Sequence, residues 1–423
     1  MAEGATGVPD GWVTTSEAAA RLGVKRATLY AYVSRGVLRS QRRPGQQESL
    51  FERAQIDALA GHTRQPGTPQ PLLRFRSVAT AVSSHRDGEL RYRGMPVEQV
   101  CAELTLGEAA ELLLGAAGRS REAAPERGPD PAQSARMPGE VRRVVAELPL
   151  ERRVPVAVAL LGAQDPLRDD RDPDRVRSAT FVLLDEVLVV LDAAAEGPAD
   201  GSPPAAGIAA QLFHALARRR PTRRELECLS VLVIALMDHG LTASTIAARV
   251  AASTRSSVTD CLVAAYATMA GPLHGGAPIA AHQLLARAMS GDPAEVVGQL
   301  LRAAEAASGT APASGAAPVP GFGHVLYTEE DPRAAVVFER LWRVRGTARL
   351  RRATEGLIDV MARRLGTFPN VDLATAAAVH AFGMPAGAGE VVFQTARTVG
   401  LVAHVLEEYA EEPLRWRGRV LDA

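Results

Sequence analysis

Three short polar stretches in a largely apolar chain carry histidines that could do chemistry. His274 lies in GPLHGGA, His239 in MDHGLTAST and His324 in PGFGH, each beside glycine. Imidazole exchanges protons near neutral pH, and glycine lets a ligand approach the main chain closely. Taken singly, His274 is equally well explained by a helix end, and His239 by a buried core position. Other polar groups must decide between these interpretations.

A cation follows the last of these histidines. Asp331-Pro332 is a helix start, with Asp as N-cap and Pro at the first helical position. Arg333 then falls in the first turn, where its guanidinium could hold a carboxylate with two hydrogen bonds. The alternative is a solvated arginine beside Glu329 and Glu330.

Two further charged residues stand in apolar surroundings. Asp372, in TFPNVDLATAAAV, precedes a run of small apolar residues. It either caps a helix or is a partly desolvated carboxylate with a raised pKa, suited to act as a base. Arg397 lies in TARTVGLVAHVLEE, whose pattern predicts an amphipathic helix in which the arginine needs a partner.

Composition limits the class of protein. The chain has 423 residues, 47% hydrophobic and 23% charged, with a formal net charge of zero, which predicts two or three soluble globular domains. The cysteines Cys101, Cys228 and Cys261 show no metal-type spacing. There is no secretory signal pattern, and the longest apolar run, 231–237, is too short to cross a bilayer. We expect a cytoplasmic location and no membrane partner.

The first fifty residues predict a small helix-turn-helix unit. Thr14 and Glu17 form a capping box for a first helix, and a second runs from about 25 to 35. Residues 14–53 hold eight Lys or Arg against three Asp or Glu. The segment resembles the MerR/excisionase-like winged helix-turn-helix family, which implies DNA as a partner. The candidate DNA contacts are Lys25, Arg26, Thr28 and Tyr30. The alternative is a domain for packing or oligomerisation.

Beyond the linker at 61–71 the apolar spacing is helical throughout, with loops expected at 118–135, 195–207 and 307–321. No nucleotide-binding glycine motif is present. From residue 73 onward the chain resembles citrate synthase, through the YRG turn at 92–94, GPLHGGA, GFGH with the following DPRA, and FPNVD. The resemblance implies an all-α fold and a homodimer. We therefore expect a helix-turn-helix domain and linker at 1–66, a large domain at 72–266 with 373–423, and a small domain at 267–372.

The resemblance also implies roles for residues. Asp372 would remove a proton from the acyl-CoA, His274 would stabilise the enol oxygen, and His324 would polarise the ketone of oxaloacetate. The oxaloacetate carboxylates would be held by His239, Arg333, Arg397 and Arg417, and coenzyme A would lie near Pro320, Gly321 and Gly323. Acyl-CoA and oxaloacetate are substrates here, so no cofactor and no metal is expected.

Three departures from the family pattern are visible. Gly240 and Thr242 stand where the family has Glu and Asn, and Leu-Ala follows Asp372 in place of an aromatic pair. The terminal RPR motif reads RGRVLD, so Arg417 is aligned with the last carboxylate ligand, and Arg415 and Arg419 compete for the role.

We expect condensation of acetyl-CoA with oxaloacetate to citrate. The alternatives are a 2-methylcitrate synthase that uses propionyl-CoA, and a DNA-binding regulator that senses a metabolite. Asp372 favours an enzyme, because a base contributes nothing to the binding of a carboxylate.

Overall fold

The structure is a computed structural model in which the chain forms two compact units, residues 1–78 and 79–423. It describes residues 11–22, 78–115 except 87, 139–195, 206–271, 274, 277–308 and 319–417, with residues 29, 33, 38, 40–41, 49–53 and 55–56 in the first unit. The side chains of 304–308 are not described. The expected DNA contacts Lys25, Arg26, Thr28 and Tyr30 lie outside the described residues, as do Arg419 and most of the three expected loops.

The described residues of the first unit include a small sheet and the helix that follows its first strand. Strands β1 (Trp12–Thr14), β3 (Leu50–Glu52) and β2 (Ser40–Gln41) pair antiparallel in that order, with Trp12 opposite Glu52. Helix α1 (Thr15–Leu22) begins with the expected capping box, because Thr14 and Glu17 each accept a hydrogen bond from the other's backbone amide. One apolar cluster holds the unit together: Val13, Ala18, Leu22, Leu29, Leu38, Phe51 and Ile56.

The second unit opens with a three-stranded meander. Strand β4 (Ser83–Arg86) pairs antiparallel with β5 (Glu89–Tyr92), and β5 pairs with β6 (Met95–Pro96). The YRG turn between β5 and β6 has positive φ at Arg93 (44°) and Gly94 (91°). The hydroxyl of Tyr92 lies 3.0 Å from the carbonyl oxygen of Ile234, near the end of helix α11 (Arg223–Leu236). The turn therefore fixes the meander against that helix end.

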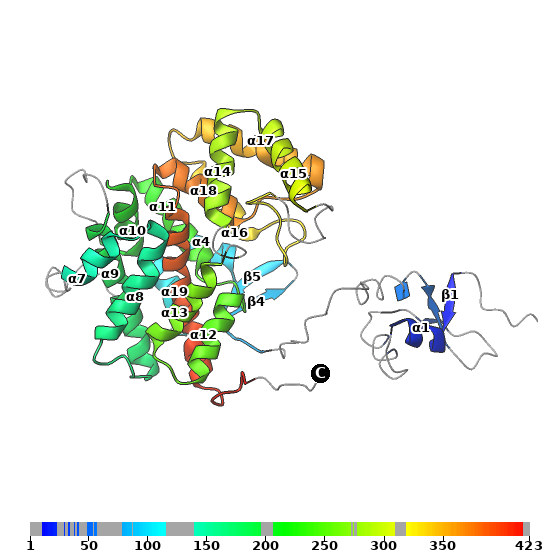
Figure 1. Cartoon of the computed structure of the whole chain (residues 1–423), viewed down its shortest axis with the longest axis horizontal. Helices are drawn as coiled ribbons and strands as arrows, with labels where there is room; N and C mark the ends of the chain where they lie inside the picture. Colours follow the sequence, from blue (N-terminus) through cyan, green and yellow to red (C-terminus); the bar gives the residue numbers. More distant parts are fainter. Residues whose placement is uncertain are drawn as a thin grey trace, which may run out of the picture. The chain divides into compact units, whose positions relative to one another are not determined.

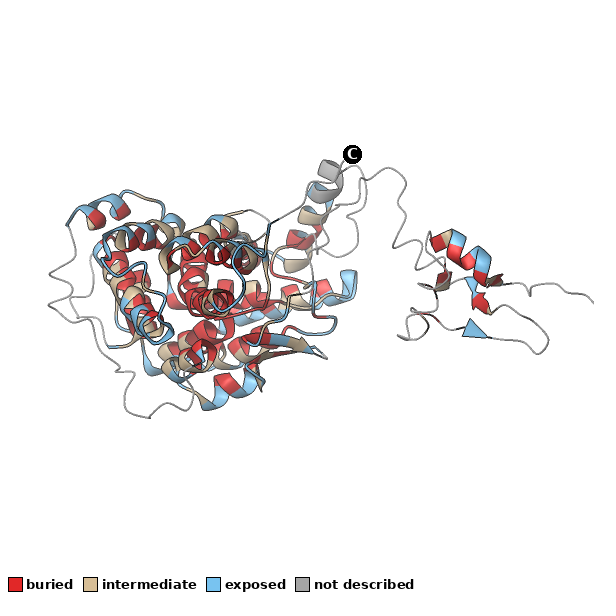
Figure 2. Ribbon diagram, turned by 90° about the horizontal axis from the view of Figure 1, so that it is seen from below, coloured by how far each residue is buried: buried red, intermediate tan, exposed pale blue. Residues whose placement is uncertain are grey.

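Helices make up most of the described remainder of the second unit, which confirms the predicted all-α fold (Figure 1). They are α4 (Val97–Glu103), α5 (Leu106–Leu114), α7 (Gly139–Ala146), α8 (Leu150–Gln164), α9 (Pro173–Ala193), α10 (Ile208–Ala217), α11 (Arg223–Leu236), α12 (Ala243–Ser253), α13 (Val258–Met269), α14 (Ala277–Ser290), α15 (Pro293–Ser308), α16 (Pro332–Leu341), α17 (Ala348–Leu365), α18 (Val371–Phe382) and α19 (Ala388–Tyr409). In Figure 2 the buried residues fill the interior faces of this unit. The expected boundary between a large and a small domain stays a prediction.

Helix α19 is the central element of the second unit (Figure 1). It packs against α5, α8, α9, α11, α12, α13, α14 and α18. The prediction of an amphipathic helix here was wrong, because α19 is buried around nearly its whole circumference. Contacts on every side leave no solvent-facing stripe, so its charged residues must find partners inside the protein.

In the described part of the chain, no helix is both long and apolar enough to cross a membrane. The three cysteines are buried and unpaired.

Candidate active site

The turn between α11 and α12 positions His239. Tyr92 contacts the carbonyl oxygen of Asp238 at 3.1 Å, and the carboxylate of Asp238 accepts hydrogen bonds from the Ser83 hydroxyl and from the amide of Gly240 (2.8 Å). Gly240 itself has φ of 68°, a conformation that side chains disfavour. The turn is thus fixed from both sides, and His239 is carried on it as a buried residue.

The aromatic side chains of His239, Tyr327 and His324 lie in contact with one another. Its Nε2 lies 2.9 Å from the hydroxyl of Tyr327, and its ring stands edge-on to the ring of His324, with 4.9 Å between centroids. The backbone amide of Leu326 donates to Nδ1 of His324 (3.0 Å), so the neutral ring carries its proton on Nε2. His239 and His324, separated by a long stretch of sequence, are therefore neighbours.

Arg333 lies beside these rings in the first turn of α16, as expected. Asp331 is the N-cap, and its carboxylate takes two hydrogen bonds from the Arg333 guanidinium, at 2.9 and 2.8 Å. The solvated alternative was wrong, because Arg333 is only 3% exposed. Burial opposes its charge, but Asp331 raises the pKa of Arg333 above its ordinary value. Nε and Nη2 of the guanidinium are therefore engaged, and in the described part of the chain Nη1 has no hydrogen bond and can donate to a ligand.

Backbone hydrogen bonds join the loops that carry His324, Arg333 and Asp372. The amide of Gly323 donates to Phe368, the amide of Asn370 donates to Gly321, and the amide of Val371 donates to the Asp331 carboxylate (2.8, 2.9 and 3.0 Å). The Asn370 side chain also donates to the Gly323 carbonyl at 3.0 Å. The stretch before α16 and the stretch before α18 thus form one surface.

Gly321, in the loop before His324, has a packing role. A β-carbon on Gly321 would lie 3.0 Å from that of Leu373, and the backbone at 321 and 323 has φ of 85° and 71°. Pro320 precedes them, half-buried. Close approach to α18 explains Gly321 without any ligand.

Asp372 is the second residue of α18. The alternative that it caps this helix was wrong, because the Asn370 side chain accepts from the amides of Asp372 and Leu373. Among the described residues, no donor contacts the Asp372 carboxylate. Desolvation raises the pKa of Asp372 to about 6, although Arg333 and Arg397 favour its ionised form. The carboxylate is thus free to accept a proton.

His274 lies across from α19. Its Nε2 is 2.9 Å from the Ser244 hydroxyl, which lies 3.1 Å from the hydroxyl of Thr242. When Ser244 donates, the His274 proton sits on Nδ1, which is then the ring atom able to donate to a substrate. Burial and Arg397 lower the pKa of His274.

Arg397 completes the group. It is 1% exposed, its Nε donates to the Leu236 carbonyl (2.8 Å), and its guanidinium lies 4.6 Å above the Phe393 ring. Its Nη1 is buried and has no hydrogen-bond partner in the described part of the chain. A buried donor without a partner is costly and indicates a missing acceptor.

Electrostatics show that these residues share one site. Burial and, after it, Arg333 lower the pKa of His239 well below its ordinary value. The same two causes lower the pKa of His324 to about 4. The charge of Arg397 lowers the pKa of His274 and favours the ionised form of Asp372. Neutral imidazoles, two cations and one carboxylate with a raised pKa are suited to bind a dianion and to move a proton beside it.

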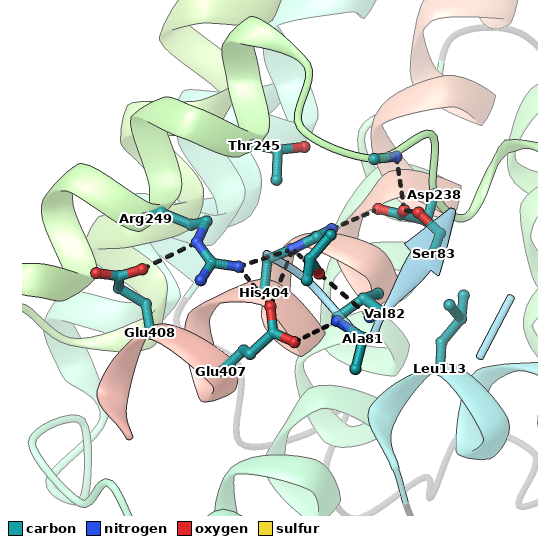
Figure 3. A network of polar contacts seen from close by, with 12 residues as sticks. Ala81, Val82, Ser83, Leu113, Asp238, Thr245, Arg249, His404, Glu407 and Glu408 are labelled. Atoms are coloured by element: carbon teal, nitrogen blue, oxygen red, sulfur yellow. Dashed lines mark hydrogen bonds and ion pairs between the residues drawn. The ribbon is translucent and has the colours of Figure 1, made fainter. Parts of the chain in front are cut away.

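A network of buried charges supports the site from behind (Figure 3). Asp238 faces His404 (Nε2 to Oδ1, 3.2 Å), and Arg249 lies between Glu408 (2.9 Å) and Glu407 (2.5 Å). Burial would raise the pKa of Asp238, but His404 and Arg397 hold it at about 2. Asp238 is therefore a permanent anion directly behind the turn of His239.

The C-terminal tail joins the same network. Arg415 donates to Glu408 from Nε and Nη2 (2.7 and 2.6 Å), and the Trp416 indole donates to Glu408 at 2.8 Å. Arg415 is therefore occupied within its own chain. Arg417 is exposed.

Several residues at the site were not among the predicted site residues. Tyr327, Ser244 and Asp238 adjoin predicted site residues and could have been found by that proximity. His85 on β4 could not, because nothing in SSHRDG marks it and the meander alone brings it to His239.

Comparisons with known proteins agree with this arrangement. The family described as citrate synthase, C-terminal domain, matches residues 72–419, and a helix-turn-helix domain matches residues 12–61. A 2-methylcitrate synthase of Mycobacterium tuberculosis (strain H37Rv) is 29% identical over 345 residues, which cover 78% of this chain and 84% of the relative. Citrate synthase 2 of Bacillus subtilis is 27% identical over 348 residues, which cover 79% and 90%.

A solved structure shows the same fold. The citrate synthase of Thermoplasma acidophilum, in a ternary complex with carboxymethyl coenzyme A and oxaloacetate, aligns with a TM-score of 0.68 at 24% identity. The alignment covers 82% of this chain and 94% of that one.

Proposed function

Because the chain belongs to the citrate synthase family, we propose that it condenses an acyl-CoA with oxaloacetate and releases free CoA. Acetyl-CoA would give citrate, and propionyl-CoA would give 2-methylcitrate. The observation that carries the proposal is Asp372, a carboxylate with a pKa of about 6 and no donor contact among the described residues, lying beside two buried arginines. Acyl-CoA and oxaloacetate are substrates, so the proposal includes no cofactor, and the unpaired cysteines accord with a reducing cytoplasm.

The chemistry follows from the protonation states. Asp372 removes a proton from the α-carbon of the acyl group, and Nδ1–H of His274 donates to the thioester oxygen as it gains charge. Nε2–H of His324 donates to the ketone oxygen of oxaloacetate, which makes its carbon electrophilic. The enol carbon attacks this carbon, and water then cleaves the thioester of the condensed product.

Two arginines and His239 hold the second substrate. Arg333 offers Nη1 and Arg397 offers Nη1, each to a carboxylate of oxaloacetate. The neutral imidazole of His239 adds a donor or an acceptor between them. The loop at Pro320, Gly321 and Gly323 would border coenzyme A.

A thiol-release assay tests the proposal. The full-length protein is incubated with oxaloacetate and, separately, acetyl-CoA, propionyl-CoA and butyryl-CoA, and free CoA is measured. We expect release that depends on oxaloacetate, with acetyl-CoA preferred. Preference for propionyl-CoA would establish the 2-methylcitrate alternative. A folded protein that binds oxaloacetate but releases no CoA from any of the three would overturn the proposal and favour a sensor.

The rate should depend on pH through Asp372. The base must be ionised, so kcat/KM for the acyl-CoA should be half-maximal at about pH 6 and fall about tenfold per pH unit below it. The pKa of His324, about 4, keeps that ring neutral throughout the range. The measurement is a profile from pH 5 to pH 9. A kcat/KM that stays constant down to pH 5 would mean that Asp372 is solvated or is not the base.

We further propose that the enzyme is a homodimer in which Arg417 of one subunit reaches the oxaloacetate site of the other. The exposure of Arg417 and the occupation of Arg415 support this assignment. Arg417→Ala should raise the KM for oxaloacetate at least tenfold. Refolding equal amounts of Arg417→Ala and Asp372→Asn chains together should restore about a quarter of wild-type activity, because half the dimers gain one intact site. No recovery, with mixed dimers shown to form, would contradict exchange between subunits.

The helix-turn-helix domain supports a second proposed function, DNA binding through Lys25, Arg26, Thr28 and Tyr30. If about four to six phosphates are contacted, raising salt from 50 to 200 mM should weaken binding roughly 10²- to 10³-fold. Selection from random duplexes followed by salt titration measures this. Removing residues 1–66 should abolish binding and leave thiol release unchanged. Failure to enrich any duplex, with loss of oligomerisation on truncation, would instead assign the domain to assembly.

A further inference from the structure

We propose that His85 is a substrate-binding residue of this site, with its Nε2 hydrogen-bonded to a carboxylate of the keto acid; the inference rests on the proposed function. The residue belongs to none of the three polar stretches described above. The inference is based on the position of His85 on β4, on the residues around its ring, and on its buried Nε2, which has no hydrogen-bond partner among the described residues.

The strand directs His85 toward the site. Side chains two residues apart on a strand point to the same face of the sheet. The Ser83 side chain points to Asp238, and its hydroxyl donates a hydrogen bond to the Asp238 carboxylate. His85 therefore faces the same turn. Its ring lies edge-on to that of His239, with 4.4 Å between centroids, and 5.9 Å from the ring of Tyr327.

Gly240 leaves room for this imidazole. A β-carbon at position 240 would lie 3.5 Å from Cε1 and 3.6 Å from Nδ1 of His85. The imidazole of His85 therefore lies where a side chain longer than a β-carbon at position 240 would extend. The sequence departs from the family pattern at this same position, with glycine in place of glutamate, so one acidic group is absent and a neutral imidazole stands in its place.

The environment of His85 favours an anion. Burial and the nearby Arg333 lower the pKa of His85, so the ring stays neutral. Its Nε2 is buried and has no hydrogen-bond partner among the described residues. The histidines beside it are neutral as well, and the nearby carboxylate of Asp331 is occupied by Arg333. A carboxylate bound by Arg333 would supply the acceptor that Nε2–H lacks.

Four variants test the assignment. His85→Leu removes the donor, His85→Gln places an amide near the position of Nε2, and His85→Asn is too short to do so. Ser84→Ala, on the exposed face of the same strand, is the matched control. The measurements are KM for each substrate, kcat, and the Kd of oxaloacetate by calorimetry on the full-length protein.

We expect His85→Leu and His85→Asn to raise the KM and Kd of oxaloacetate roughly 10- to 100-fold, the loss of a hydrogen bond to a charged group. The KM for acyl-CoA should change little, and His85→Gln should stay within about fivefold of wild type. If His85→Leu does not fold, the Gln and Asn pair carries the comparison. Oxaloacetate affinity within twofold of wild type in His85→Leu, or in His85→Asn where the Leu variant is unfolded, would overturn the inference, as would equal losses in the Gln and Asn variants.

Calorimetry keeps this result separate from the proposed reaction. If wild type binds oxaloacetate but releases no CoA, a weaker Kd in His85→Leu still supports the assignment of His85, while condensation is overturned. If wild type turns over and the Kd is unchanged in the variants, condensation stands and the inference about His85 fails.

Discussion

Asp372→Asn is expected to lower kcat and, in the same variant, to raise the free energy of unfolding. Removal of the base should lower kcat about 10²- to 10⁴-fold, while oxaloacetate still binds to Arg333 and Arg397. The same variant no longer has to keep an ionised carboxylate in a site that disfavours it. A residue whose neutralisation stabilises the protein while stopping the reaction carries the signature of a strained catalytic group.

The gain in stability should depend on pH. Below pH 3.8, the ordinary value, the Asp372 carboxyl is protonated in both the folded and the unfolded chain. Between 3.8 and about 6 the unfolded chain releases a proton that the folded protein keeps, so the free energy of unfolding falls as pH rises. Above 6 the deficit is constant, about 2–3 kcal/mol, and Asp372→Asn removes it.

Urea unfolding at pH 8 and pH 5, with thiol release measured in parallel, checks both parts. The difference in stability between variant and wild type should be larger at pH 8. Asp359→Asn, which changes an exposed carboxylate on α17, is the control and should alter neither quantity. A variant of Asp372 that is less stable than wild type at pH 8 would show that the carboxylate is stabilised by contacts in the folded protein.

Arg249→Met is expected to lower the free energy of unfolding by about 3–5 kcal/mol, because it removes the cation of half-buried Glu407 and one of the two cations of buried Glu408. Arg249 is fully buried and bonds Glu408, which is also fully buried, and Glu407. The attraction within such a pair offsets the desolvation of both ions. Removing Arg249 leaves Glu407 without its cation and leaves Glu408 with Arg415 alone.

Two comparisons isolate this effect. Arg351→Met breaks an exposed pair with Glu355 on α17 and should change stability by about 0.5 kcal/mol or less. Arg249→Met combined with Glu408→Gln should be less destabilised than Arg249→Met alone, since fewer uncompensated charges remain. Urea midpoints with unchanged slopes would quantify each variant. A loss below 1 kcal/mol for Arg249→Met would mean that water reaches the network.

The sequence predicted those features that depend on nearby residues. The cap at Asp331, the capping box at Thr14 and the first-turn position of Arg333 all follow from spacings of three residues or fewer. The family pattern supplied the order of the polar stretches along the chain. These signals were sufficient for the fold class and for most of the residues that gather at the site.

Features created by tertiary packing could not be predicted in this way. Arg249 sits in TIAARVAAS, where its spacing equally suits a solvent-facing position, and only α19 makes it a buried ion. His85 reaches His239 because a strand pairs with its neighbour and then packs on a helix end. The amphipathic interpretation of α19 failed for the same reason, since a helix surrounded by other helices needs no polar stripe.

The network behind the active site also has a consequence for how the protein is made. The Ala81 amide donates to Glu407 at 2.7 Å, across 326 residues of sequence. At about 5–20 residues per second, a ribosome needs roughly 15–65 s to make that stretch, so the meander emerges long before α19. For about the first half of that interval Ser83 and Tyr92 lack Asp238 and Ile234, and Ala81 lacks Glu407 until its end. Completion of the active site therefore waits for α19, which carries Arg397, and a nascent chain that stops before this helix lacks both that arginine and the Ala81–Glu407 hydrogen bond.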